Sequence, residues 1–236
     1  MSCRSEERGA GTRREPAVLV FNGWAAGSEA WELTSFRHDW VFSYVEELDG
    51  LPDRVLDDLG EAVLVGFSMG GAMALKALVE RPDRVRGLVL VSATPRMMEV
   101  REQGEDGSMK VVWPGMSERR LAALRLGTQQ LFASDPSPIY ARENLERGLE
   151  FLRATDLRAQ LLALAEGPQG EEIRQLPVVI FQSERDGIVR PGNAEFLQRV
   201  FPQAKVCRIP GSEHVLPITI PEQIDQAVAE VLGFRR

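Results

Sequence analysis

The chain has 236 residues and a mass of 26.3 kDa, enough for one domain with a sizeable core. Hydrophobic residues make up 44% and charged residues 27%, with 21 Gly and 14 Pro, which excludes collagen-like, low-complexity and wholly disordered chains. The net charge of −7 and the pI near 5.1 argue against a nucleic-acid-binding surface over the whole molecule and leave only a local basic patch open.

Cysteine usage and the N-terminal segment predict a protein of a reducing compartment. Cys3 and Cys207 stand at opposite ends of the chain without a CxxC pair, so neither a disulfide framework nor a zinc site is encoded. Residues 1–16 are charged and lack an apolar run, which indicates a disordered tail rather than a signal peptide. No window reaches the roughly 18 apolar residues of a spanning helix. We expect a soluble cytoplasmic monomer without metal or cofactor, and with neither a membrane nor a nucleic acid as partner.

Short apolar runs bounded by Gly, Pro or Asn predict the strands of one sheet. The predicted strands are residues 17–21, 40–44, 62–67, 86–93, 176–182 and 204–210. Helical spacing is weak over residues 46–60 and clear over 69–80, 192–200 and 221–233. Because strands and helices alternate, we expect an α/β fold with a mostly parallel sheet covered by helices on both faces.

The strand pattern stops after residue 93 and resumes only at residue 176. The intervening segments 117–133, 139–153 and 156–165 carry helical spacing and are separated by Gly and Pro. This pattern predicts an inserted helical cap. The expected cap is residues 96–165, inserted into a core of residues 17–95 and 166–236.

The sequence GFSMGG at residues 66–71 is the most specific chemical motif of the chain. Gly66, Ser68 and Gly70 form a GxSxG pattern between an apolar strand and a helix, which is the context of a nucleophile elbow. The helix that begins after Ser68 favours negative charge at its first turn. Ser68 is therefore the candidate nucleophile; the alternative is a glycine-rich turn with an incidental serine.

A serine hydroxyl needs a general base, and the chain contains only two histidines. His214 follows the last predicted strand, where a loop at the carboxyl edge of the sheet would hold it. His38 precedes a strand, and we interpret it as a surface or structural residue. His214 is therefore the candidate base.

A carboxylate must orient this histidine, and in this chain order it should follow a strand between the serine and the histidine. The segment SERDGIVRP at residues 183–191 meets that condition. Asp186 is the preferred candidate because it stands at an Asp-Gly turn after the strand, and Glu184 is the second choice. By itself, an Asp-Gly pair is better explained as a simple turn.

The oxyanion of a tetrahedral intermediate requires two backbone N–H donors. We expect one of them to be the amide of Met69, the residue after the nucleophile. The loop FNGWAAG at residues 21–27 turns at Gly23, which would direct the amide of Trp24 toward the serine. The Trp24 side chain would also wall the substrate pocket. A core tryptophan that covers the sheet edge is the other interpretation, and the two are compatible.

On these residues, the chain resembles the α/β-hydrolase fold from Ala17 to the C-terminal helix. Within that superfamily it is similar to the pimeloyl-acyl carrier protein methyl ester carboxylesterases of biotin synthesis, the BioH group. The resemblance rests on NGWAAGSEAW, GFSMGGAMAL, RPDRVRGLVLVSATP, a WPGM segment, LRATDL, RDGIVRP and the histidine loop. Asn22 stands where this family usually has a histidine, and the short EELDGLPDRVLDDLG segment resembles the compact BioG esterases.

The resemblance implies a serine esterase that hydrolyses the methyl ester of a carrier-bound pimeloyl group to the free acid and methanol. The reaction would pass through an acyl intermediate on Ser68 and would need no cofactor. Apolar side chains of the cap would line the acyl channel, with packing inside the cap as the alternative role. These side chains are Trp113, Met116, Leu131 and Phe132.

The resemblance also implies that cap arginines bind the acidic carrier protein. Residues 96–160 hold ten basic and ten acidic side chains, so the cap is the less acidic face of a chain with net charge −7. Solvation of the cap helices explains the same arginines equally well. The candidates are Arg119, Arg120, Arg125, Arg142, Arg147 and Arg153, and the cap also carries Arg158.

Two other functions stay open at this point. The same three residues would serve a general small-molecule esterase, a lipase-like enzyme or a thioesterase. A protein of this fold could also bind a ligand without turnover, as the altered loop at Asn22 would allow. The complete set of Ser68, Asp186 and His214 argues against this last interpretation.

Overall fold

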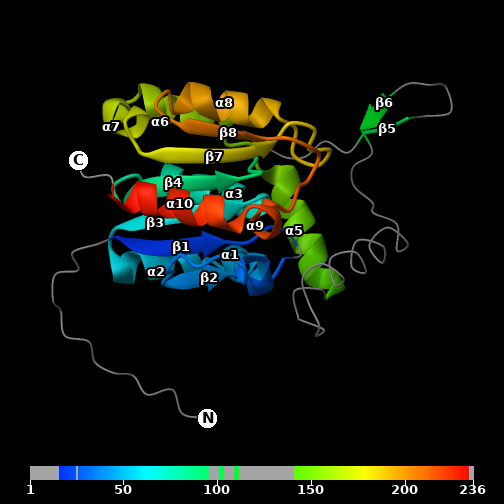
Figure 1. Cartoon of the computed structure of the whole chain (residues 1–236), viewed down its shortest axis with the longest axis horizontal. Coiled ribbons are helices and arrows are strands. Elements are labelled where there is room, and N and C mark those ends of the chain that lie inside the picture. The colour runs from blue at the N-terminus through cyan, green and yellow to red at the C-terminus, as the bar shows by residue number, and fades with distance from the viewer. Residues whose placement is uncertain (1–15, 25, 96–100, 104–108, 112–140, 234–236) are drawn as a thin grey trace, which may run out of the picture.

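A six-stranded, wholly parallel sheet in the order β2-β1-β3-β4-β7-β8 forms the centre of the molecule (Figure 1). The computed structural model describes residues 16–24, 26–95, 101–103, 109–111 and 141–233. The strands of the sheet are β1 (Ala17–Phe21), β2 (Trp40–Phe42), β3 (Ala62–Phe67), β4 (Val85–Val91), β7 (Val178–Ser183) and β8 (Lys205–Ile209). A second, antiparallel pair consists of β5 (Arg101–Gln103) and β6 (Met109–Val111).

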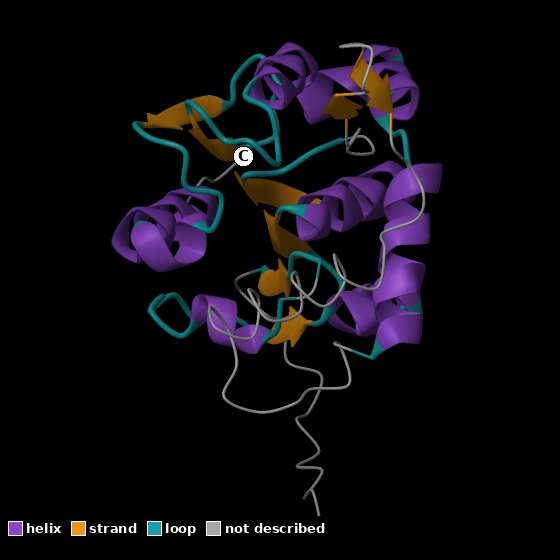
Figure 2. Cartoon of the chain, turned by 90° about the vertical axis from the view of Figure 1, so that its right-hand side faces the viewer, coloured by secondary structure: helices purple, strands orange, loops and turns teal. Residues whose placement is uncertain are grey.

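Helices cover both faces of the sheet, as Figure 2 shows. In chain order they are η1 (Ser28–Trp31), α1 (Tyr44–Leu48), α2 (Leu51–Leu59), α3 (Met69–Glu80), α5 (Arg142–Ala154), α6 (Arg158–Glu166), α7 (Gly170–Arg174), α8 (Gly192–Val200), α9 (Leu216–Thr219) and α10 (Pro221–Gly233). The predicted α/β architecture with a parallel sheet between helical layers is therefore confirmed.

Alternation of side chains along the strands divides the core into two clusters. Leu64 and Leu88 face the layer that contains α2, α3, α6 and α8. Val65 and Val89, one residue further along each strand, face the layer of η1, α9 and α10. Both faces of the central strands are buried, which explains why these strands are continuous apolar runs in the sequence.

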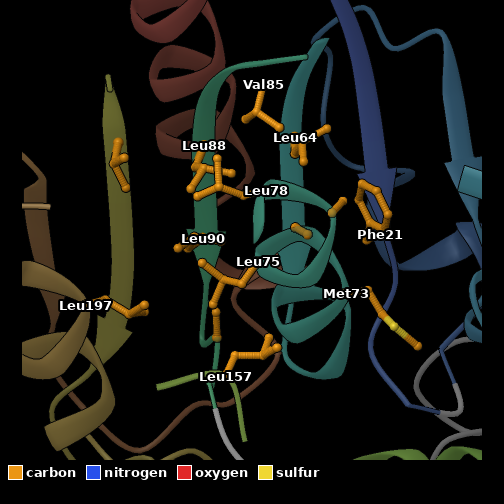
Figure 3. Packing of buried hydrophobic residues seen from close by; sticks show 14 of the residues in the cluster. Phe21, Leu64, Met73, Leu75, Leu78, Val85, Leu88, Leu90, Leu157 and Leu197 are labelled. Atoms are coloured by element: carbon orange, nitrogen blue, oxygen red, sulfur yellow. The ribbon is translucent and has the colours of Figure 1, made fainter. Parts of the chain in front are cut away.

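Helix α3 packs against the middle of the sheet (Figure 3). Its segment MGGAMALKALVE is rich in strong helix formers. The helix ends at Glu80, with Arg81 as its C-cap, because Pro82 cannot continue a helix. Leu75 and Leu78 are fully buried in the cluster that also holds Leu88 and Leu90. This packing fixes α3 relative to β3, the strand that immediately precedes it.

Several predicted element limits are corrected by the structure. The predicted strand 40–44 ends at Phe42, because Ser43 caps α1: its hydroxyl accepts the Glu46 amide, and the Glu46 carboxylate accepts the Ser43 amide. The predicted strand 86–93 spans Val85–Val91. Strands β5 and β6 precede the first predicted cap helix and lie where the sequence predicts no strand.

Other predicted elements agree with the structure or lie outside its described part. Helices α5 and α6 stand where residues 139–153 and 156–165 carry helical spacing. The predicted helix 117–133 and residues 1–15 of the predicted tail lie outside the described residues. Within the described part of the chain, no helix combines the length and apolar character needed to cross a membrane.

Truncation of a core side chain on α3 should destabilise the fold strongly. Leu78 is fully buried, so we expect Leu78→Ala to lower the free energy of unfolding by about 2–5 kcal/mol. Leu33 is 60% exposed, and Leu33→Ala should change it by less than about 0.5 kcal/mol. Denaturant unfolding of both variants measures the difference. Equal losses in the two variants would contradict the packing described for α3.

Candidate active site

The candidate residues gather at the carboxyl edge of the sheet, where the strand order reverses. From β1 the chain moves outward to β2 and then returns to β3 on the other side of β1. In open parallel sheets, such a reversal leaves a crevice at the carboxyl ends of the strands. Trp24 follows β1 and Ser68 follows β3, so both stand at this point.

Ser68 lies in a sharp turn between β3 and α3. Its φ of 54° and ψ of −117° are unusual for a residue with a side chain, and α3 begins at the next residue, Met69. The first turn of α3 packs closely against the end of β1. A Cβ atom at Gly70 would lie 2.2 Å from the carbonyl oxygen of Phe21 and 2.5 Å from that of Asn22, so only glycine fits there. This is the geometry expected of a nucleophile elbow.

A chain of hydrogen bonds links the three candidate triad residues. His214 Nε2 lies 3.0 Å from Ser68 Oγ, and His214 Nδ1 lies 2.8 Å from Asp186 Oδ2. With Nδ1 protonated toward the carboxylate, Nε2 presents its lone pair to the serine hydroxyl. The Asp186 side chain is fully buried, whereas 14% of the His214 side chain is exposed. The arrangement is suited to removing a proton from Ser68.

Backbone amides fix the carboxylate of Asp186. Its Oδ1 accepts the N–H groups of Ile188, at 2.8 Å, and Val189, at 2.9 Å, so only Oδ2 is directed to the histidine. The second choice, Glu184, is exposed and donates its amide to Ile209 of β8. His38 is exposed, as expected, and its ring contacts that of Phe36 at 5.9 Å between centroids.

The two predicted oxyanion donors are the backbone amides of Trp24 and Met69, and both residues belong to segments that lie next to Ser68. A Cβ atom at Gly23 would lie 3.2 Å from Ser68 Cβ, which shows how closely the loop after β1 approaches the serine. Trp24 directly follows Gly23. Met69 opens α3, and its N–H is one of the first-turn donors that an α-helix leaves without an internal partner.

The side chain of Trp24 connects this loop to α5. Its indole Nε1 donates a hydrogen bond of 3.2 Å to the carbonyl of Leu145. Gly148 lies one turn further along α5, and a Cβ atom there would come within 2.7 Å of the Trp24 ring. Trp24 is partly buried and packs on the core, which fits the interpretation of a tryptophan covering the sheet edge. Helix α5 stands at the carboxyl end of the sheet in Figure 1.

Beneath the loop lies a buried acid that the sequence analysis missed, Glu47 of α1. Burial raises the pKa of its carboxyl well above the ordinary value, the nearby Asn22 backbone amide lowers it by less, and the charge of Glu46 raises it further. Neither Glu47 oxygen forms a hydrogen bond of normal geometry within the described residues. Asn22 is also buried, and its Oδ1 accepts the indole N–H of Trp31.

Most of the predicted substrate and carrier contacts lie outside the described part of the chain. Arg147 of α5 is exposed, and its Nη2 lies 2.6 Å from Asp49 Oδ1. Arg158 likewise pairs with Asp156. Arg142 and Arg153 belong to α5, but their side chains are outside the described part. Also outside it are Trp113, Met116, Leu131, Phe132, Arg119, Arg120 and Arg125.

No group of three or more His, Cys, Asp or Glu residues within the described ranges is arranged to hold a metal ion. Cys207 is a free thiol on β8, partly buried, and burial raises its pKa. It is separate from the hydrogen-bonded chain of Ser68, His214 and Asp186.

Comparison with known proteins identifies the family. Residues 8–231 match the alpha/beta hydrolase family. The chain belongs to this family. This α/β-hydrolase is 24% identical to a pimeloyl-[acyl-carrier protein] methyl ester esterase of Nitrosomonas europaea, over 90% of this chain and 94% of that protein. It is 27% identical to the protein of the same name from Edwardsiella ictaluri, over 96% of each.

A solved structure has the same fold as this α/β-hydrolase. A bromoperoxidase from Bacillus anthracis superposes with a TM-score of 0.64 and 19% identity, over 93% of this chain and 92% of that chain. The family and fold predicted from the GxSxG context and the alternating elements are thereby confirmed.

Replacement of the buried acid should stabilise the α/β-hydrolase at neutral pH. Because the folded-state pKa of Glu47 is raised, its carboxyl favours the folded state below its unfolded-state pKa, and this contribution is lost as pH rises through the folded-state pKa. We expect Glu47→Gln to have a higher Tm than wild type at pH 8 and to lose that advantage toward pH 4. Thermal unfolding across this pH range measures the effect.

The exposed Glu32 provides the matched control, because Glu32→Gln removes the same charge at the surface. Its unfolding curves should follow those of the wild type. A Tm difference for Glu47→Gln that is constant with pH, or negative at pH 8, would contradict the effect assigned to burial of Glu47.

Proposed function

We propose that this α/β-hydrolase is a serine carboxylesterase with Ser68 as nucleophile, His214 as general base and Asp186 as the residue that orients the base. The observation that carries the proposal is the continuous hydrogen-bonded chain from Ser68 Oγ through the imidazole to Asp186, with contacts of 3.0 and 2.8 Å. The strained turn at Ser68 supports it, because a non-glycine residue in such a conformation is typical of functional sites.

The reaction takes place in two acyl-transfer steps. Ser68 Oγ attacks the ester carbonyl carbon while His214 Nε2 takes the hydroxyl proton. The amides of Met69 and Trp24 hold the tetrahedral oxyanion. His214 then protonates the departing alcohol, and the acyl group remains on Ser68. Water, deprotonated by His214, attacks this acyl-enzyme and releases the carboxylic acid, which restores the serine.

The proposed substrate is the methyl ester of a pimeloyl group carried on acyl carrier protein, and the products are the free acid and methanol. The names of the Nitrosomonas europaea and Edwardsiella ictaluri relatives support this choice. Residues 96–165, which include α5 at the carboxyl end of the sheet, would form the cap over the site. The apolar residues Trp113, Met116, Leu131 and Phe132 would line its acyl channel.

A small-molecule esterase or thioesterase with the same three residues is the second candidate. The observation that favours it is that two cap arginines already form ion pairs with carboxylates of this chain. Arg147 is paired with Asp49, and Arg158 is paired with Asp156. An arginine held by a neighbouring carboxylate must exchange that partner before it can contact a carrier protein.

Loss of the nucleophile provides the first test. We expect Ser68→Ala to lower kcat by at least about 10⁴-fold on carrier-bound pimeloyl methyl ester and on a short p-nitrophenyl ester. Purified wild type should label with a fluorophosphonate at Ser68, as detected by mass spectrometry of the labelled peptide. Exposed Ser28→Ala is the matched control and should retain full labelling and turnover.

The outcomes separate the candidates. Hydrolysis of the carrier-bound ester, together with growth of a biotin-requiring bacterium that lacks its own pimeloyl esterase, supports the proposed substrate. Hydrolysis of the p-nitrophenyl ester alone shifts the function to a small-molecule esterase. Absence of labelling at Ser68 in a folded wild type would indicate a ligand-binding protein and overturn the proposal.

A carrier-binding role for Arg147 makes a separate prediction. Arg147→Ala should raise the KM for the carrier-bound ester by roughly 1.4- to fivefold, as for a surface ion pair worth about 0.2–1 kcal/mol. The KM for the p-nitrophenyl ester should not change. Asp49→Asn releases Arg147 from its ion pair and should not raise either KM. A KM that rises equally for both substrates in Arg147→Ala would show an effect on the pocket instead of on carrier binding.

A further inference from the structure

Two buried serine hydroxyls hold the backbone that carries His214. Ser92, directly after β4, donates its hydroxyl to the carbonyl oxygen of His214 at 3.0 Å. Ser183, the last residue of β7, donates its hydroxyl to the carbonyl oxygen of Glu213. The two carbonyls belong to consecutive residues. The backbone at His214 is therefore attached to the ends of two neighbouring strands, β4 and β7.

Ser92 has a backbone conformation that is unusual for a serine. Its φ of 45° and the φ of Ser68 are the positive φ values of non-glycine residues in the described part of the chain. Ser92 is fully buried, and its amide donates to Phe181 of β7 at 2.9 Å. A glycine would adopt this backbone without strain but would have no hydroxyl. The presence of serine at a strained, buried position therefore points to the hydroxyl as the group required there.

Adjacent residues of β7 hold the two loops that meet at the site. Ser183 binds the loop of His214, as described above. Gln182 is also fully buried, and its side-chain amide donates to the carbonyl of Val189 at 3.0 Å, in the loop of Asp186. The end of one strand thus sets the relative positions of the acid and the base.

We propose that Ser92 and Ser183 are positioning residues, which direct the imidazole of His214 by holding the Glu213 and His214 carbonyls. The proposal rests on the function proposed above, because it assigns the two hydroxyls a role in keeping His214 aligned between Ser68 and Asp186. Neither hydroxyl contacts the reacting atoms. The His214 carbonyl also accepts the amide of Leu216 at 3.0 Å, so the loop keeps one attachment when the Ser92 hydroxyl is removed.

Kinetics of five variants test the role of the hydroxyls. Ser92→Ala and Ser183→Ala should each lower kcat on a p-nitrophenyl ester roughly tenfold, and the double variant about 100-fold, with KM unchanged, because a small misplacement of a catalytic group reduces turnover to this extent. Ser92→Gly relieves the backbone strain without restoring the hydroxyl, and it should be as impaired as Ser92→Ala. Ser183→Thr keeps a hydroxyl and should retain more activity than Ser183→Ala.

Spectroscopy of the imidazole supplies a readout that does not depend on turnover. The chain has only two histidines, so ¹⁵N-histidine labelling yields two ring systems, and His38→Gln identifies that of His214. Wild-type His214 should show a single tautomer with the proton on Nδ1, hydrogen-bonded to Asp186. The double variant should show a mixture of tautomers and a weakened Nδ1–H hydrogen bond.

The possible results are distinguishable. Unchanged His214 spectra and kcat in the double variant, with or without a lowered Tm, would overturn the proposal and leave a structural role only. Full activity of Ser92→Gly would also overturn it, since the backbone conformation would then be what matters. If wild type hydrolyses no ester but the variants change the His214 tautomer, the proposed function fails while the positioning of the imidazole is supported.

Discussion

The close approach of α3 to the end of β1 is the constraint on which the rest of the site depends. Only Ser68 separates the end of β3 from the start of α3. The first turn of the helix lies so close to the carbonyls of Phe21 and Asn22 that only a glycine fits at position 70. This contact forces Ser68 into a strained backbone conformation, at a cost of about 1–3 kcal/mol. Burial of Leu75 and Leu78 offsets that cost, because each buried leucine contributes about 1.5–3 kcal/mol.

Polar groups at the ends of strands hold the candidate acid and base near Ser68. Asp186 and His214 both stand on loops, yet buried hydrogen bonds hold these loops at several points: Asp186 by two backbone amides, and the residues around it by Gln182. Because such bonds are directional and lie away from water, they restrict the loops far more than apolar contacts would. The acid and the base of the candidate site therefore stand on loops that hydrogen bonds hold in fixed positions.

The sequence predicts this site better than it predicts what surrounds it. Ser68, Asp186 and His214 each follow a predicted parallel strand, and the carboxyl ends of such strands share one edge of the sheet, which predicts that the three residues meet. The apolar run from Trp40 continues to Tyr44, whereas β2 ends at Phe42 because the capping box at Ser43 begins α1 there. Glu47 sits in an acidic segment that indicates a solvated helix, and only tertiary packing buries it. Ser92 and Ser183 are small polar residues at the ends of strands. Neither the periodicity of hydrophobic residues nor a motif spacing predicts that such residues are buried.

The strand order also determines when the site forms during folding. β1, β2, β3 and β4 are close in sequence, and their pairing assembles the turn at Ser68 with local connections. The pairing of β4 with β7 must instead close a loop that spans residues 92–177, which is entropically costly and slow compared with local contacts. The strands that are close in sequence supply Ser68, whereas Asp186 and His214 follow β7 and β8. The three candidate triad residues come together only in the complete sheet, so their geometry is itself a marker of the fully folded chain.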